Sequence, residues 1–216
     1  PLKWPQSWRT VFRNPDRIQS PVMINSDKWS FVPGHLYWLR AALAAQNKNL
    51  VVYGFGWERP NITRLSHRLF ELVRILSTGT MPSFKGLKNI LTVPIAYHGE
   101  ARDKVSQMSN YAVAVVIENS REFLSEKLFD AWFAGCVPVY VGSNIETMGI
   151  PSGLVIQSNP DITAIQEAIN RAFLVDRTGF LDGLENFLSS KKALEWRSDH
   201  ALKSILSAAL ATKDAR

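Results

Sequence analysis

Ser125, Glu126 and Lys127 stand where a polar loop meets an apolar helical stripe, and this group carries the richest chemistry in the chain. Ser125 is placed to cap the helix, so Glu126 and Lys127 fall on its first turn. A phosphate bound there would meet free backbone N–H groups, the positive end of the helix dipole and the Lys127 ammonium. Glu126 would then accept hydrogen bonds from neutral hydroxyls such as those of a ribose. The alternative is structural, with Glu126 as a cap and Lys127 as ordinary surface.

The elements that must position this group form a strand, a loop, a helix and a second strand. Residues 111–117 are apolar and rich in β-branched side chains without alternation, which is typical of a strand buried on both faces of a parallel sheet. A helix follows Ser125 and ends near Gly135, and residues 137–141 form the second strand. This order predicts a βαβ unit with a right-handed crossover.

The rest of the pattern extends this unit into an α/β domain. Strands alternate with helices, which predicts a Rossmann-like, doubly wound parallel sheet. The length of 216 residues suits one large domain. We expect an irregular arm over residues 1–20, the α/β domain over 21–190 and a helical tail over 191–216. Further strands are predicted at 22–24, 50–53, 90–96 and 154–156, and helices at 34–46, 61–76, 103–109, 162–175, 180–188 and 201–211.

Ligands of open α/β sheets bind beyond the carboxyl ends of the strands. The loops expected there are residues 25–27, 54–56, 118–125 and 142–144. Neither a P-loop nor a complete G-x-G-x-x-G pattern occurs, and no G-x-S-x-G elbow is present. The four histidines lack metal-ligand spacing, and no Asp-x-Asp pair occurs, so we expect neither a bound metal nor a cofactor.

Charge and cysteine content limit the classes of partner. A net charge of +6 favours phosphorylated ligands, polyanions or anionic membranes. No recognised module indicates nucleic-acid binding. A single cysteine, Cys136, excludes an intrachain disulfide and a cysteine zinc cluster. The helix predicted at 61–76 carries Arg64, Arg68 and Arg74 outside its apolar face, which indicates a solvated surface or a patch for an anionic membrane or a lipid-linked substrate.

Residues 111–143, YAVAVVIENSREFLSEKLFDAWFAGCVPVYVGS, resemble the donor-binding signature of the α-1,3-fucosyltransferase family. The shared features are the apolar strand, Glu-Asn-Ser from residue 118, Glu-Lys from residue 126, Ala-Gly-x-hydrophobic-Pro-Val and the closing glycine. The segments at 53–57, 97–99, 103–104 and 150–151 look like those of bacterial members, so the resemblance spans about residues 21–190. It implies a single C-terminal, donor-binding lobe of the GT-B type, followed by C-terminal helices.

The resemblance implies an inverting, metal-independent transfer of fucose from GDP-fucose, the donor substrate, to a glycan hydroxyl. By similarity, Lys127 holds the diphosphate, Glu126 holds the ribose, and Asn119 and Ser120 line the phosphate loop. An upstream arginine should neutralise the diphosphate, and Arg40 is the nearest candidate.

Three further positions complete the nucleotide-sugar site that the resemblance implies: Gly54, Phe123 and Ser125. Phe123 stands where the family usually has a tyrosine that touches the donor, which leaves the base or sugar preference open. The family's general base belongs to an N-terminal acceptor lobe, so here the base must come from missing sequence, a partner or an unidentified residue. Two alternatives remain: a GT-B lobe that uses another nucleoside-diphosphate sugar, and a non-catalytic module that binds glycans or polyanions.

The expected partners are a nucleotide sugar, a glycan or lipid-linked saccharide acceptor and, at the surface, a peripheral membrane contact. Protein glycosylation and lipopolysaccharide synthesis are the processes that fit. A bacterial protein of this kind is expected in the cytoplasm or on the inner membrane, and a fragment of a eukaryotic enzyme in the Golgi lumen.

Overall fold

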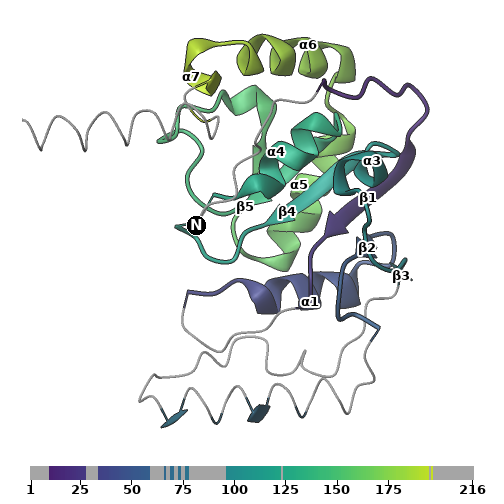
Figure 1. Ribbon diagram of the computed structural model, residues 1–216, viewed down its shortest axis with the longest axis vertical. Coiled ribbons are helices and arrows are strands. Elements are labelled where there is room, and N and C mark those ends of the chain that lie inside the picture. The colour runs from purple at the N-terminus through teal and green to yellow at the C-terminus, as the bar shows by residue number, and fades with distance from the viewer. Residues whose placement is uncertain are drawn as a thin grey trace, which may run out of the picture.

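Six parallel strands form the central sheet of the described part of the chain (Figure 1). The computed structural model describes residues 10–27, 34–58, 66, 69–70, 73, 76–77, 96–122, 124–194 and 196. The strand order is β3-β2-β1-β4-β5-β6, and every pair is parallel. The strands are β1 (Ile18–Ile24), β2 (Val51–Tyr53), β3 (Ala96–Tyr97), β4 (Tyr111–Ile117), β5 (Val137–Val141) and β6 (Ile156–Gln157).

Helices cover both faces of the sheet, which confirms the predicted Rossmann-like, doubly wound α/β fold. On one face α3 and α4 contact each other and the central strands, and on the other face α1 contacts α5. Figure 1 shows α6 and α7 at the end of the molecule opposite α1. The helices are α1 (Tyr37–Gln46), α3 (Lys104–Met108), α4 (Glu126–Phe133), α5 (Ile162–Phe173), α6 (Arg177–Leu188) and α7 (Lys191–Leu194), with a 3-10 turn η2 (Ser152–Leu154).

The order in which the chain adds strands to the sheet reverses at the β1–β4 pair. From β1 it moves outward through β2 to β3, then returns to β4 on the other side of β1 and continues to β5 and β6. Pairs such as Val22 with Ala114 and Ile117 with Val141 align the carboxyl ends of the central strands. A reversal of this kind opens a crevice at the carboxyl edge, where doubly wound sheets bind ligands.

Some predicted boundaries differ from the observed ones. β1 begins at Ile18, inside the arm expected over residues 1–20, and α1 begins at Tyr37 and not at residue 34. Only the end of the strand predicted at 90–96 and parts of the helix predicted at 61–76 lie in the described residues, where 66, 69–70, 73 and 76–77 are helical. The helix predicted at 201–211 lies outside them, and the bounds of the three predicted segments stay predictions.

Residues 10–17, which precede β1, form no helix or strand, and Arg17 packs them against the domain. This arginine is 8% exposed, and its guanidinium donates to the carbonyl oxygens of Tyr111 (2.7 Å), Ala134 (2.8 Å) and Phe12 (2.8 Å). Its burial lowers the pKa of Arg17 to about 10, so the side chain stays charged at neutral pH. One guanidinium therefore fastens the chain before β1 to the start of β4 and the end of α4.

Gly54, just after β2, allows the carboxyl ends of β1 and β2 to approach closely. Its φ is +134°, and a Cβ at this position would overlap the carbonyl oxygen of Asn25. This carbonyl belongs to the backbone and accepts a hydrogen bond from the Trp57 indole at 2.6 Å. It therefore cannot move aside freely.

We expect Gly54→Ala to lower the free energy of unfolding by about 2–3 kcal/mol, because it combines a left-handed backbone with a steric overlap. Gly99→Ala is the matched control, since Gly99 also has positive φ (+91°) but its Cβ would meet no atom within 4 Å. This control should lose about 1 kcal/mol. Urea unfolding measures both values, and equal losses would contradict the close approach at Gly54.

Candidate functional site

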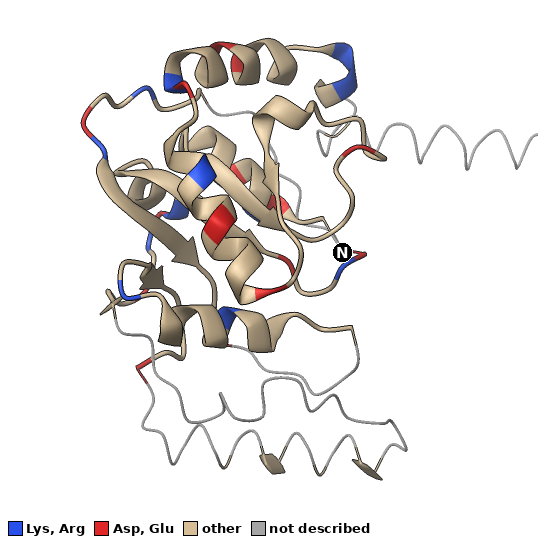
Figure 2. Cartoon of the chain, turned by 180° about the vertical axis from the view of Figure 1, so that it is seen from behind, with Lys and Arg blue, Asp and Glu red and all other residues tan. Residues whose placement is uncertain are grey.

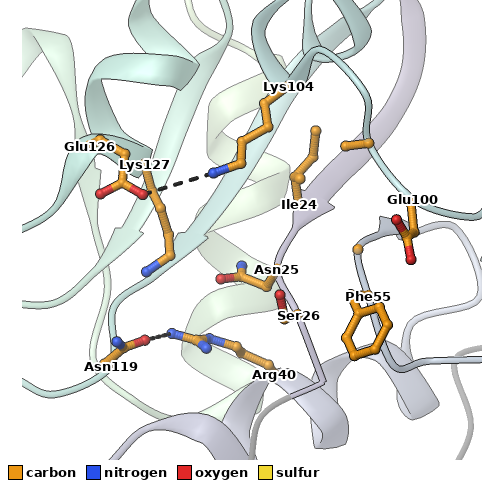
Figure 3. Close-up of a pocket in the computed structure, with 12 residues that line it drawn as sticks. Ile24, Asn25, Ser26, Arg40, Phe55, Glu100, Lys104, Asn119, Glu126 and Lys127 are labelled. Carbon is orange, nitrogen blue, oxygen red and sulfur yellow. Dashed lines mark hydrogen bonds and ion pairs between the residues drawn. The ribbon is translucent and has the colours of Figure 1, made fainter. Parts of the chain in front are cut away.

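A cavity of about 350 Å³ opens at the carboxyl edge of the sheet, where the strand order reverses (Figure 3). Three of the four loops predicted at this edge reach it, namely those that follow β1, β2 and β4, whereas residues 142–144 are not among its lining. The lining residues are Ile24, Asn25, Ser26, Arg40, Gly54, Phe55, Glu100, Ala101, Lys104, Asn119, Glu126 and Lys127.

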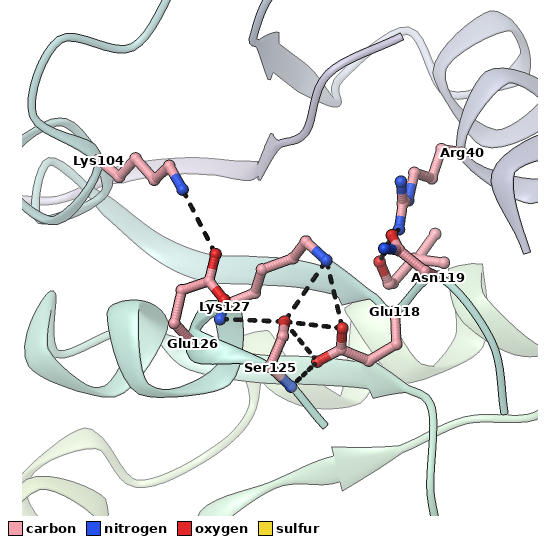
Figure 4. Close-up of polar contacts among 8 residues, drawn as sticks. Arg40, Lys104, Glu118, Asn119, Ser125, Glu126 and Lys127 are labelled. Atoms are coloured by element: carbon pink, nitrogen blue, oxygen red, sulfur yellow. Dashed lines mark hydrogen bonds and ion pairs between the residues drawn. The ribbon is translucent and has the colours of Figure 1, made fainter. Parts of the chain in front are cut away.

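Glu118 anchors the cavity wall from below the surface. It directly follows β4, is fully buried, and its carboxylate accepts hydrogen bonds from the Ser125 N–H (2.9 Å) and the Ser125 Oγ (2.8 Å) (Figure 4). The Lys127 ammonium lies 3.2 Å from the same carboxylate. Ser125 also caps α4, because its Oγ accepts from the Lys127 N–H at 3.4 Å. The end of β4 and the start of α4 are thereby joined by one polar cluster.

The charge of Lys127 depends on this cluster. Burial lowers the pKa of Lys127, the nearby Arg40 lowers it further, and the Glu118 carboxylate raises it. An ammonium has three donors, of which one meets Glu118 and one meets the Ser125 Oγ, at 3.4 Å. The third meets no acceptor among the described residues, and Lys127 lines the cavity. A cation with one uncommitted donor at a helix N-terminus suits an anionic ligand.

Arg40 supports the opposite wall. It is the single charged residue of α1 (Figure 2) and is 3% exposed. Its Nη2 donates to the Ile117 carbonyl and to the Asn119 Oδ1, both at 2.7 Å, and its guanidinium lies over the Tyr37 ring. Burial lowers the pKa of Arg40 to about 10. In this arrangement Arg40 orients Asn119.

Lys104 and Glu126 face each other across the cavity mouth. The Lys104 Nζ lies 3.8 Å from the Glu126 Oε1, and both side chains are partly exposed. Such a pair contributes little to stability and can rearrange around a ligand. The position of Lys104 follows from α3, which begins at this residue after its cap, Asp103, and packs beside α4.

The structure brings most of the predicted site residues to one cavity. Ser120 and Ser125 do not line it: Ser120 pairs with His35 in an isolated antiparallel bridge, and Ser125 is the cap of α4. Phe123 lies outside the described residues. Which of these residues bind a ligand stays a prediction. Those that line the cavity are Arg40, Gly54, Asn119, Glu126 and Lys127.

Sequence reasoning missed three contributions to the site. It placed Glu118 in a polar loop and did not foresee its burial, although an acidic residue that directly ends an apolar strand is a usable signal. It assigned no side chain to Asn25, whose loop it did locate. Lys104 entered only as part of a flanking match, because no pattern in its own segment points toward α4.

Neither a metal site nor a membrane span is found within the described residues. No three histidine, cysteine, aspartate or glutamate side chains among them gather closely enough to hold an ion. Among the described helices, none has the length and apolar character needed to cross a bilayer.

Comparisons with known proteins give a coarse likeness to solved glycosyl-transferring enzymes. No protein-family model and no curated protein sequence matches the chain. An α1,3-fucosyltransferase solved with GDP-fucose is 16% identical with a TM-score of 0.44, over 79% of this chain and 39% of that one. An α,α-trehalose 6-phosphate synthase from Burkholderia multivorans is 14% identical with a TM-score of 0.48, over 92% and 44%. A glycotransferase of kitacinnamycin is 9% identical with a TM-score of 0.39, over 96% and 48%.

The chain thus spans less than half the length of each of these proteins.

Removal of the Glu118 carboxylate should shift the pH dependence of anion binding. Only the ammonium form of Lys127 attracts an anion, so affinity falls as pH rises through the pKa of Lys127. Because Glu118 raises that pKa, the Glu118→Gln variant should begin to lose affinity for inorganic pyrophosphate at a lower pH than the wild type. Calorimetry from neutral pH to about pH 10 measures this shift. Glu146→Gln, at an exposed position, is the control, and coincident curves for all three proteins would refute the coupling.

Proposed function

We propose that this domain is the donor-binding lobe of a GT-B glycosyltransferase and that its cavity binds a nucleoside-diphosphate sugar, with GDP-fucose as the first candidate. The observation that carries the proposal is the position of Lys127. Its ammonium stands on the first turn of α4 and lines a cavity at the switch point of a doubly wound sheet. The signature from residue 111 to residue 143 supports the same assignment.

The charge of the cavity suits a diphosphate. Three cationic side chains line it, Arg40, Lys104 and Lys127, against two carboxylates, Glu100 and Glu126. The α4 N-terminus adds backbone N–H groups and a positive dipole end. Glu126, partly exposed beside Lys127, can accept hydrogen bonds from ribose hydroxyls. We infer that the diphosphate lies against Lys127 and the α4 N-terminus and that Arg40 orients Asn119 toward it.

The chemistry that follows is an inverting, metal-independent transfer. As the bond between the sugar and the diphosphate breaks, negative charge develops on the leaving phosphate oxygen. A preorganised cation and helix terminus at that point lower the barrier. Lys127 is preorganised because Glu118 and Ser125 hold its ammonium from behind. The acceptor is a glycan or a lipid-linked saccharide, and the resemblance assigns the base that takes its proton to a second lobe.

The Lys127→Ala variant tests the donor site. We expect it to bind GDP and GDP-fucose about 10- to 100-fold more weakly than the wild type, since a hydrogen bond to a charged group is lost. Titration calorimetry gives the dissociation constants, and Lys48→Ala, at an exposed position after α1, is the matched control. Equal affinities in all three proteins would show that the site is wrongly assigned.

A panel of GDP-, UDP- and ADP-sugars identifies the donor. Preference for a UDP- or ADP-sugar would leave the GT-B assignment in place and would replace GDP-fucose as the candidate donor. Binding of polyanions with steep salt dependence, but of no sugar nucleotide, would favour the non-catalytic alternative.

A peripheral membrane contact is a further part of the proposal and is supported by a separate region. Leu69, Phe70, Val73 and Leu76 are each at least half exposed. Residues 59–95, to which they belong, contain six arginine and lysine residues and a single acidic residue, Glu71. Exposed apolar side chains within a basic stretch are typical of proteins that lie on anionic membranes. Such a contact fits a location in the bacterial cytoplasm at the inner membrane.

Phe70→Glu should weaken co-sedimentation with vesicles rich in anionic lipid about tenfold, because it replaces an apolar anchor with a like charge. Leu174→Glu is the control, since Leu174 is 84% exposed but lies at the end of α5. An equal loss for both variants, or no loss for either, would remove the membrane from the proposal.

A further inference from the structure

The side chain of Asn25 lines the cavity, and its Oδ1 has no hydrogen-bond partner. Asn25 follows β1, is 5% exposed, and its Oδ1 meets no donor among the described residues. Figure 3 shows this side chain in the middle of the cavity wall, between Lys127 and Phe55. Lys104 and Lys127 share a small recess with it. Buried amides in folded proteins are nearly always paired, so each exception calls for an explanation.

The backbone of Asn25 is held by two hydrogen bonds, which fixes the point from which its side chain extends. The Asn25 N–H donates to the Tyr53 carbonyl at 3.0 Å, and its own carbonyl accepts from the Trp57 indole at 2.6 Å. Gly54 packs against the same carbonyl. Because Asn25 is only 5% exposed, its unpaired Oδ1 is shielded from solvent in the folded state.

The chemistry of the missing partner can be deduced from what the amide offers. Asn25 presents an acceptor, Oδ1, and a donor, Nδ2. A phosphate oxygen that is ionised only accepts, so it cannot satisfy Oδ1. A hydroxyl both donates and accepts, and it satisfies either atom of the amide. The anionic part of a ligand is already served by Lys127 and the α4 N-terminus, which leaves Asn25 for a hydroxyl next to that anionic part.

We propose that Asn25 binds a hydroxyl of the transferred sugar and makes the site prefer an intact nucleoside-diphosphate sugar to the free nucleoside diphosphate. This inference rests on the proposed function and deepens it, because it places the sugar of the ligand beside the loop that follows β1. A buried polar group selects strongly against a ligand that leaves it unpaired. The product nucleotide lacks the sugar, so Asn25 also favours product release over product retention.

The experiment compares two ligands on three proteins. Calorimetry gives dissociation constants of GDP and GDP-fucose for the wild type, for Asn25→Leu and for the control Asn49→Leu, whose side chain is exposed after α1. We expect Asn25→Leu to bind GDP within twofold of the wild type and GDP-fucose about tenfold more weakly. The control should change neither constant. If the wild type prefers the UDP pair, UDP and UDP-glucose take the place of the GDP ligands.

A thermal melt of the unliganded proteins adds a second readout. Leucine has the same number and branching of side-chain heavy atoms as asparagine and removes an unpaired polar atom, so Asn25→Leu should melt at or above the temperature of the wild type. A lowered melting temperature would show that Asn25 has a structural role and would overturn the inference.

The possible failures are distinguishable. Equal weakening of GDP and GDP-fucose in Asn25→Leu would place the contact on the ribose or the diphosphate and would overturn this inference while leaving the proposed function in place. Unchanged binding of both ligands would also overturn it alone. A wild type that binds no nucleoside diphosphate and no sugar nucleotide would overturn both proposals together.

Discussion

The buried carboxylate of Glu118 is the constraint on which the carboxyl edge of this domain depends. It directly follows β4, and it meets the Ser125 N–H, the Ser125 hydroxyl and the Lys127 ammonium within 3.2 Å. A charge taken out of water is costly, and this one is offset by an opposite charge and by hydrogen bonds to both of its oxygens. Such a pair adds little net stability, but it fixes where α4 starts and where its lysine points. A residue buried behind the cavity wall, Glu118, thus fixes the position of the Lys127 charge and raises the pKa of Lys127.

Three consecutive residues at the end of β4 organise both walls of the cavity. The carbonyl of Ile117 and the amide of Asn119 receive the Arg40 guanidinium from α1, on one face of the sheet. Glu118, between them, receives Lys127 from α4, on the other face. Alternate residues of a strand point to opposite faces, so one short stretch of chain can engage helices from both layers. The doubly wound topology makes this possible because it places α1 and α4 on opposite sides of neighbouring strands.

Local patterns predicted the unit from β4 to β5 well, since its strands are continuously apolar and its helix has a cap and a terminal glycine. The start of β1 was predicted late, at Val22, because the apolar run of this strand begins only after Pro21. The structure accommodates Pro21 within β1 through an irregularity in the pairing with β4, where the register shifts between Ile18 and Pro21. The sequence pattern of β1 alone does not predict this register shift, because the shift depends on the pairing with β4.

The convergence of distant side chains could be predicted only in part for a similar reason. The carboxyl ends of parallel strands share an edge, so the loops after β1, β2 and β4 were expected to meet. Glu118 and Lys127 are nine positions apart in the sequence, so the loop between them must turn back for the two side chains to meet. Arg40 and Asn119 are 79 positions apart. Neither contact has a local signal. They follow from the order of strands in the sheet, which the spacing of elements does not determine.

The buried polar residues of this edge are of two kinds, and the difference separates structure from function. Glu118 and Ser125 satisfy each other, and Arg40 is met by backbone and by Asn119, so these groups need no ligand to be stable. The Asn25 side chain is also buried, but its Oδ1 is unpaired. Its position in the cavity wall, on a backbone held at both its N–H and its carbonyl, is the observation from which we propose that Asn25 binds a hydroxyl of the ligand.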